Sequence, residues 1–254
     1  MLSRKTSLGH KATSFLTAFA LFMALLISSG FCAQEPADSE LEIAVSQAIL
    51  AKKIRPDLEN AYETEAHTIL GIDENGNITT VYAMVFRATF SFDEGKLRLE
   101  SGSHVPRAIS FERDNTGAYN LIEYWGPLDG DYYSSSIGAK FPRQLWDKTD
   151  TQLYIAEHSM KALRNAQDYY GVTDHVAPEI IILKPLEMEK GSNPNWEDYF
   201  MIIDDTDGQI DLSEAYIWDV MIDFSKSGKY NLQIIVSDNA GNENRSLDYE
   251  VTIK

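Results

Sequence analysis

The sequence predicts a two-layer α+β domain, made of a helix, an antiparallel meander and a second helix, followed by an all-β sandwich. Three observations predict this order. Apolar residues recur at helical spacing in residues 41–50 and 151–169. Between these segments, four runs rich in β-branched and aromatic residues are joined by short turns. Beyond residue 175, strand-like runs alternate with turns rich in Asp, Asn and Gly.

Residues 1–33 have the pattern of an export signal. Three basic residues, Arg4, Lys5 and Lys11, precede the apolar run 15–27 (FLTAFALFMALLI), and small residues follow it. The run is shorter than the roughly 20 residues that a spanning helix needs. No later stretch is apolar enough to cross a membrane. We therefore expect a secreted or cell-surface protein with no transmembrane span after signal cleavage.

Cys32 is the only cysteine of the chain and lies at the end of this signal. A single cysteine forms no internal disulfide. It could be lipidated and become the mature N-terminus, but the bulky Phe31 beside it fits a lipoprotein signal poorly. We favour ordinary cleavage after residue 32 or 33.

The mature chain is strongly acidic. The whole chain has 22 basic and 39 acidic residues, and the signal holds three basic and no acidic ones, which leaves 19 against 39 and a net charge of −20. This charge repels phosphate backbones, so we expect no nucleic-acid partner. The 44% hydrophobic content is sufficient for packed cores.

The elements of the first domain follow in order. A polar tether at 34–40 precedes the helix 41–50, and Pro56 ends or redirects the chain after it. The strands are expected at 65–72, 78–92, 97–111 and 118–125, the third of them open to a break at 102–106.

The remainder of the first domain leads to its second helix. A loop or short turn covers 126–142, and the helix 151–169 is expected to bury Leu153, Ala156, Met160, Leu163 and Ala166 or Gln167. Gly171 ends this helix. The predicted divisions are a signal at 1–33, a tether at 34–40, an α+β domain at 41–170, a linker at 171–175 and an all-β domain at 176–254.

Part of the first domain resembles a known region. The segments are 67–71 (HTILG), 80–82 (TVY), 91–97 (SFDEGKL), 123–133 (EYWGPLDGDYY) and 140–142 (KFP). They resemble an extracytoplasmic accessory region of Gram-positive β-lactam-sensor-type membrane metallopeptidases, over about a third of the chain. The peptidase part is absent, because no His-Glu-x-x-His occurs. The resemblance implies a sensor-like or accessory domain without proteolysis.

Aromatic and acidic residues in 125–133 form a candidate ligand-binding lip. Exposed Tyr and Trp are favoured at recognition surfaces because they offer large, rigid contact area. Aromatic residues at strand ends also commonly close a core, and both interpretations stay open for the set Trp125, Asp129, Asp131, Tyr132 and Tyr133.

The C-terminal residues resemble a second family. Residues 177–180 (APEI), 207–208 (DG), 228–230 (GKY) and 238–242 (DNAGN) are similar to a bacterial immunoglobulin-like family found on surface proteins and in crystal toxins. In the strand 230–236, Tyr230, Leu232, Ile234 and Val236 are expected to face inward. Such a module implies a spacer or adhesion role.

Acidic residues in this module offer a candidate calcium site. Asp204, Asp205, Asp207 and Asp238 are the proposed ligands, since Ca²⁺ takes several oxygen ligands. Their spacing does not fit an EF-hand. The alternative is Asx turns, in which Asp side chains accept from nearby backbone groups. No other cofactor is expected.

No catalytic residue is predicted. The histidines His67, His104, His158 and His175 are scattered, with His67 expected to be packed in a strand and His158 on a helix surface. Gly-x-Ser-x-Gly, phosphate-loop and dinucleotide motifs do not occur. We expect a non-enzymatic, extracytoplasmic binding or sensor protein whose partner is a protein or cell-wall component. The alternative is a regulator or inhibitor of an envelope peptidase or cell-wall enzyme.

Overall fold

Four antiparallel strands form the first sheet in the computed structural model, which describes residues 39–51 and 53–254. The strands pair in chain order, β1-β2-β3-β4. This confirms the predicted antiparallel meander. The predicted signal and Cys32 lie outside the described residues. The strand bounds are β1 Tyr62–Asn75, β2 Ile78–Asp93, β3 Lys96–Arg113 and β4 Tyr119–Trp125.

Strand β3 is continuous where a break was left open. Its residues pair with β2 from Lys96 to Glu112, and Pro106 lies opposite Met84. The ladder shifts only between Thr89 and Phe90 of β2, where β3 has one extra residue. Such a bulge bends a strand without ending it, so the sheet is longer than the apolar runs alone predict.

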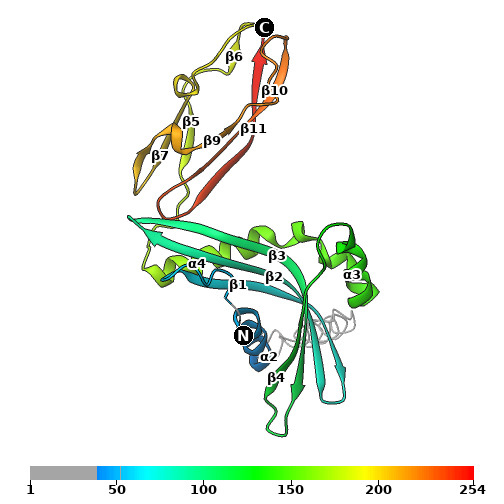
Figure 1. Cartoon of the computed structure of the whole chain (residues 1–254). Coiled ribbons are helices and arrows are strands. Elements are labelled where there is room, and N and C mark those ends of the chain that lie inside the picture. The colour runs from blue at the N-terminus through cyan, green and yellow to red at the C-terminus, as the bar shows by residue number, and fades with distance from the viewer. Residues whose placement is uncertain (1–38, 52) are drawn as a thin grey trace, which may run out of the picture. The chain divides into compact units, whose positions relative to one another are not determined.

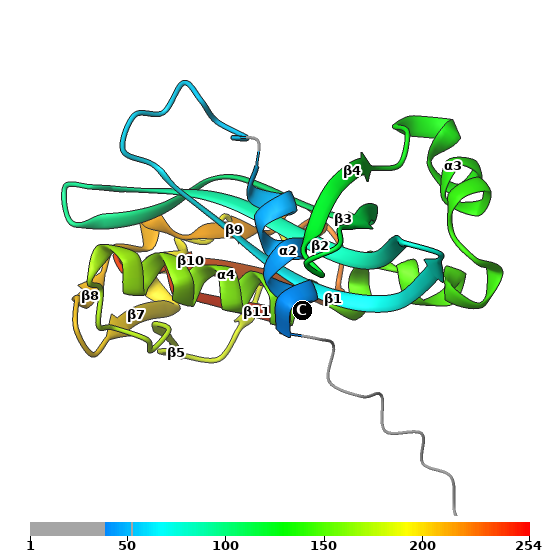
Figure 2. The same ribbon diagram turned by 90° about the horizontal axis from the view of Figure 1, so that it is seen from below.

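Helices pack on both faces of this sheet, so the predicted two-layer arrangement is wrong and the region has three layers (Figures 1 and 2). Helix α2 (Ser39–Leu50) covers the face that carries Val81, Ala83 and Val85. Helix α4 (Ile155–Tyr170) covers the face that carries Phe86, Ala88 and Phe90. Successive strand residues point to opposite faces. Because β2 is apolar at odd and even positions alike, it is buried on both sides.

Helix α2 buries the residues that its sequence predicts. Leu41, Val45, Ala48 and Ile49 recur at helical spacing and pack against Ile109, Phe111 and the odd-numbered residues of β2. Its exposed side includes Ile43. Each fully buried aliphatic side chain contributes about 1.5–3 kcal/mol, so this short helix is stabilised mainly by packing.

Helix α4 buries only part of the predicted face. Ala166 and Gln167 are buried and Leu163 packs on the core, whereas Ala156, Leu153 and Met160 are exposed. The apolar pattern missed His158 and Ala162, the other two buried residues, because His158 is polar. Residues Thr151–Leu153 form a 3-10 turn, and the α-helix begins at Ile155. Gly171 ends the helix at φ 71°, as predicted.

The segment between β4 and α4 contains more helix than expected. It has 3-10 turns at Gly130–Tyr132 and Arg143–Thr149 and a short helix, α3 (Tyr133–Lys140). Ile137, Phe141 and Leu145 from this segment pack with Leu70, Tyr82, Met84 and Ala108. This small cluster extends the core along the α4 face of the sheet.

The C-terminal residues form two further sheets. One has the order β6-β11-β10-β9 and the other β5-β7-β8. Leu232 and Ile234 of β10 are buried, as their alternation predicts, and share one core with Phe200 of the other sheet. The bounds are β5 Glu179–Ile182, β6 Glu187–Met188, β7 Phe200–Asp204, β8 Gly208–Ile210, β9 Tyr216–Trp218, β10 Gly228–Ser237 and β11 Glu243–Ile253.

Two glycines allow the tight turns of this region. Gly208, at φ 75°, begins β8 after the β7 hairpin, and Gly241, at φ 80°, closes the turn between β10 and β11. The turn 238–242 also contacts the first region, since the Leu97 N–H donates to the Asn239 carbonyl at 2.8 Å. Residues Glu40–Lys254 form one compact unit, and the domain division at 171–175 stays a prediction.

Candidate functional site

Three aspartates from separate segments form an acidic cluster, Asp174, Asp204 and Asp238. Asp174 follows α4, Asp204 ends β7, and Asp238 follows β10. One carboxylate oxygen from each lies within 4.8 Å of the others. Asp204 and Asp238 are buried, at 4% and 7% exposure. The fold therefore concentrates carboxylates at a largely buried position.

Local turns orient these carboxylates but do not satisfy them fully. Asp204 Oδ1 accepts from the backbone N–H groups of Thr206 and Asp207, at 2.9 and 2.8 Å. Asp174 Oδ1 accepts from the Val176 N–H at 2.9 Å. The Oδ2 atoms of Asp174 and Asp204 are buried and have no hydrogen-bond partner within residues 39–51 and 53–254.

Both carboxylate oxygens of Asp238 accept hydrogen bonds, but its surroundings disfavour the ionised form of its carboxyl group. Its Oδ1 accepts from the Asn242 N–H at 2.7 Å and its Oδ2 from the Asn242 side-chain amide at 2.8 Å. The pKa of Asp238 is raised to about 6, mainly by burial; the hydrogen bonds from Asn242 oppose this rise, and the charges of Asp174 and Asp204 add to it. Across the described residues, no ion pair joins Lys, Arg or His to the cluster.

The structure brings together half of the predicted calcium ligands. Asp204 and Asp238 belong to the cluster. Asp205 is exposed, and its Oδ1 lies 3.4 Å from the Thr206 hydroxyl. Asp207 instead accepts from the backbone N–H and side-chain amide of Asn239, at 2.7 and 2.8 Å, which fixes the neighbouring turn.

Sequence reasoning missed Asp174. It is the only acidic residue between the C-cap Gly171 and Glu179. A lone carboxylate in a short connection forms no pattern with residues 30 and 64 positions away. Only the folded arrangement of α4, β7 and β10 brings these three side chains together.

The predicted aromatic lip divides between core and solvent. Trp125 packs against Phe141, with ring centroids 6.0 Å apart, and Tyr133 packs on the same cluster. Burial raises the pKa of Tyr133. Asp129, Asp131 and Tyr132 are exposed. The five predicted residues therefore do not form one binding surface.

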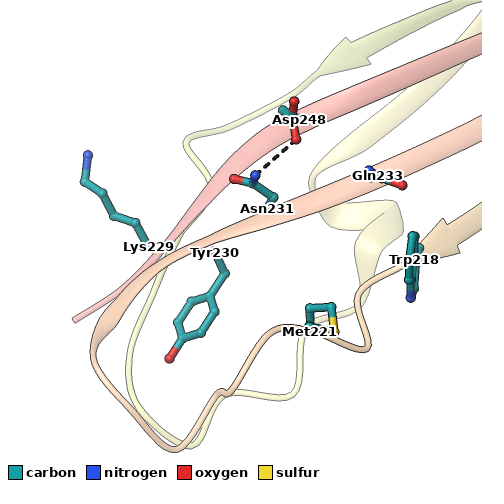
Figure 3. A pocket seen from close by; sticks show the side chains of 7 residues that line it. All are labelled: Trp218, Met221, Lys229, Tyr230, Asn231, Gln233 and Asp248. Carbon is teal, nitrogen blue, oxygen red and sulfur yellow. Dashed lines mark hydrogen bonds between the residues drawn. The ribbon is translucent and has the colours of Figure 1, made fainter.

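A groove of about 430 Å³ lies on the face of the four-stranded sheet opposite to its core (Figure 3). Trp218 of β9 lies in register with Gln233 of β10. The Asn231 side-chain amide donates to Asp248 at 3.0 Å, from β10 to β11. Lys229, Tyr230 and Met221 complete the lining. We call this the Trp218 groove.

Exposed apolar residues extend from this groove. Tyr216, Trp218, Val220 and Met221 lie within six positions and are 62%, 42%, 73% and 73% exposed. Single exposed apolar residues are ordinary, but contiguous ones mark interaction sites. The sequence does not mark β9 as an exposed strand, because aromatic and β-branched residues such as Tyr216–Trp218 are equally typical of a buried strand.

A second groove, of about 450 Å³, lies beside α3. It is lined by Tyr133, Ile137, Gly138 and Trp146 with neighbouring polar residues. Trp146 is 43% exposed, and its indole N–H donates to the Phe141 carbonyl at 2.9 Å. One residue of the predicted lip, Tyr133, therefore lines a groove, although the other lip residues do not.

His104 and His158, which have no common motif in the sequence, lie close together in the fold. His158 is 2% exposed, so its predicted surface position is wrong. His158 Nδ1 lies 3.1 Å from His104 Nε2, and its Nε2 lies 2.8 Å from the Thr68 hydroxyl. The pKa of His158 is lowered to about 4, first by burial and then by His104, and burial also lowers the pKa of His104. Both shifts favour the neutral form of the rings.

His67 is a packed strand residue, as predicted, but it joins two carboxylates. Its Nδ1 lies 2.8 Å from Glu65, and its Nε2 lies 2.8 Å from Glu42 of α2. Burial lowers its pKa, but Glu65 and Glu42 outweigh burial and raise it. Ser46 of α2 donates to Glu65 at 2.7 Å. This network attaches α2 to β1.

Comparisons with family models, with curated proteins and with solved structures give no match for this chain. In the part of the chain that the structure describes, none of the helices has the length and apolarity that a membrane crossing requires.

Proposed function

We propose that this chain is an exported, non-enzymatic binding protein of the cell envelope, and that its C-terminal region is an immunoglobulin-like module that binds a saccharide polymer. The Trp218 groove carries this proposal. It combines exposed aromatic area with amide, carboxylate and ammonium groups on one sheet face.

The pairing of two sheets supports the immunoglobulin-like assignment. The residues of 179–253 form a four-stranded and a three-stranded sheet that share one hydrophobic cluster. A sandwich of two sheets around a common core is the architecture of such modules. The predicted export signal supports an extracytoplasmic location.

The chemistry of the groove favours a saccharide. A sugar ring has an apolar C–H face, which packs on a flat aromatic ring such as Trp218, and hydroxyl groups at its edge. Amides and carboxylates such as Gln233 and Asp248 can donate to or accept from those hydroxyls. Small-molecule sites are enclosed and mainly apolar, whereas this groove is open and half polar, so an extended polymer suits it better. The strongly acidic chain disfavours anionic polymers.

Binding to insoluble glycan tests the proposal. The mature chain is sedimented with purified peptidoglycan that has been freed of protein and anionic polymers. We expect retention of the wild type, and Trp218→Ala should weaken it about 30-fold, the effect of losing an aromatic contact of about 2 kcal/mol. Tyr132→Ala, an exposed residue outside both grooves, is the matched control and should bind normally.

Two results would contradict this assignment. Equal retention of wild type and Trp218→Ala, with loss in Trp146→Ala, would move the binding site to the groove beside α3. Absence of retention of the wild type would reject a peptidoglycan-type saccharide as the ligand.

A further inference from the structure

The acidic cluster has oxygen atoms that the chain itself does not satisfy. Asp204 is 4% exposed, and its Oδ2 accepts no hydrogen bond among the described residues. The same is true of the buried Oδ2 of Asp174. A buried carboxylate oxygen without a donor or cation is costly. The expected complement is a positively charged ligand from solution.

Ordinary turn formation does not explain this arrangement. Asp114 shows a turn in which the carboxylate is fully used, since its Oδ1 accepts from Thr116 and Ala118 and its Oδ2 from Asn120. Those bonds lower the pKa of Asp114 to about 2, the Thr116 hydroxyl contributing most. In the acidic cluster, the turn bonds of Asp204 and Asp174 occupy Oδ1 and leave Oδ2 for another partner.

We propose that Asp174, Asp204 and Asp238 bind one calcium ion, which joins the segment after α4 to the ends of β7 and β10. The candidate ligands are all oxygen atoms, the donors of hard cations. Ligands on opposite sides of Ca²⁺ are about 4.6–5.2 Å apart, because each Ca–O bond is about 2.3–2.6 Å. Oxygens within 4.8 Å of one another fit that range.

The charge of the set favours calcium over magnesium. Mg²⁺ is usually held by one or two carboxylates and keeps several waters, whereas Ca²⁺ is bound by flexible sets of carboxylates and carbonyls. Three carboxylates from three segments, with no paired cation among the described residues, match the second pattern. Backbone carbonyls or water would complete the coordination.

Binding at this place would stiffen a connection in the chain. Asp238 holds Asn242, and Gln167 of α4 donates to the Asn242 side-chain oxygen and the Ala240 carbonyl, both at 2.9 Å. A cation on Asp238 therefore stabilises the turn that α4 contacts, while Asp174 secures the segment leaving α4. This inference does not depend on the Trp218 groove.

Calcium titration of the whole mature chain tests the site. Isothermal titration with Ca²⁺, after removal of metal with a chelator, should give one ion per chain and a Kd of about 10⁻⁴–10⁻³ M, typical of extracellular modules. Saturating Ca²⁺ should raise the melting temperature by several degrees. Asp204→Asn should weaken binding at least about tenfold, and the exposed neighbour Asp205→Asn, the matched control, should bind normally.

A second measurement separates ion binding from a structural role of Asp204. In chelator, Asp204→Asn should be at least as stable as the wild type, because it removes a buried charge and retains the Oδ1 acceptor. In Ca²⁺ it should be less stable than the wild type. A variant that is destabilised equally in both conditions would overturn the proposal, as would absence of saturable wild-type binding up to about 10 mM Ca²⁺. An equal response to Mg²⁺ would overturn the choice of calcium.

Discussion

The Glu42–His67–Glu65 network and the acidic cluster both contain buried carboxylates, but they balance the charge in opposite ways. In the first, His67 lies between Glu42 and Glu65, which raise its pKa, so the chain supplies a partner that becomes a cation on protonation. In the second, Asp174, Asp204 and Asp238 meet only neutral donors. The difference is the one that the proposed calcium site requires: the first region has a balancing group within the chain, whereas the acidic cluster would take its cation from solution.

The largest effect should come from breaking the balanced network. His67→Ala leaves Glu65, which is 9% exposed, without its cation, and also detaches Glu42 of α2. Loss of one partner of a buried pair costs about 4 kcal/mol. Chemical denaturation should show this loss. The control Lys229→Ala removes an exposed ion pair with Glu250 and should cost less than about 1 kcal/mol. Similar losses in both variants would mean that His67 acts as an ordinary surface charge.

The pair His104 and His158 should give the next largest effect, a decrease in the free energy of unfolding as the pH falls. The pKa of His158 is about 4, below its usual value, through burial and then His104; Lys161 and His67 act in the same direction and Glu157 opposes them. A depressed basic pKa favours the neutral folded form, so stability is kept above pH 6.5 and falls as the pH drops toward 4. The loss is about 3 kcal/mol for this shift of the pKa.

The variant His158→Gln isolates this pH effect, since glutamine does not titrate. The difference in unfolding free energy between wild type and variant should shrink as the pH falls from 7 to 4. A constant difference would show that His158 does not change its pKa on folding. The contribution of His67 to stability changes with pH in the opposite direction. Because its pKa is raised, it stabilises the fold at low pH, and this contribution is lost as the pH rises through the folded-state pKa.

The comparison also shows what a sequence can predict. The four strands of the first sheet and the two main helices followed from apolar spacing, and Gly171 marked the end of α4, although α4 begins at Ile155 and not at 151. The buried face of α4 followed only in part: Ala166 and Gln167 were predicted to be buried, but His158 is polar and finds its partners only in the folded chain. The third layer does have a signal in the sequence, because β2 is apolar at odd and even positions alike, the pattern of a strand that is covered on both faces.

The candidate sites were less predictable than the fold. Asp204 and Asp238 could be selected because they lie in acidic turns, but their neighbours Asp205 and Asp207 looked equally suitable. What distinguishes Asp204 and Asp238 is burial, together with an unpaired oxygen on Asp204, and both depend on the packing of two sheets. Trp218 had no sequence signal at all, since exposure of one strand face is a property of the assembled sheet.

The smallest effect concerns the hydrogen bonds of Gln167, beside the acidic cluster. The side-chain oxygen of Gln167 accepts from the Arg164 guanidinium at 2.6 Å. Gln167 is fully buried, and its amide donates to the Ala240 carbonyl and to Asn242 Oδ1. Gln167→Leu keeps most of the volume but leaves these acceptors short of a donor, which costs about 2 kcal/mol. Thermal unfolding should detect it, with Gln233→Leu on the sheet surface as the matched control. Because Gln167 steadies the turn that contains Asp238 and Asn242, the loss should be smaller in Ca²⁺ than in chelator. Equal losses in both conditions would show that the cation and Gln167 act on separate parts of the fold.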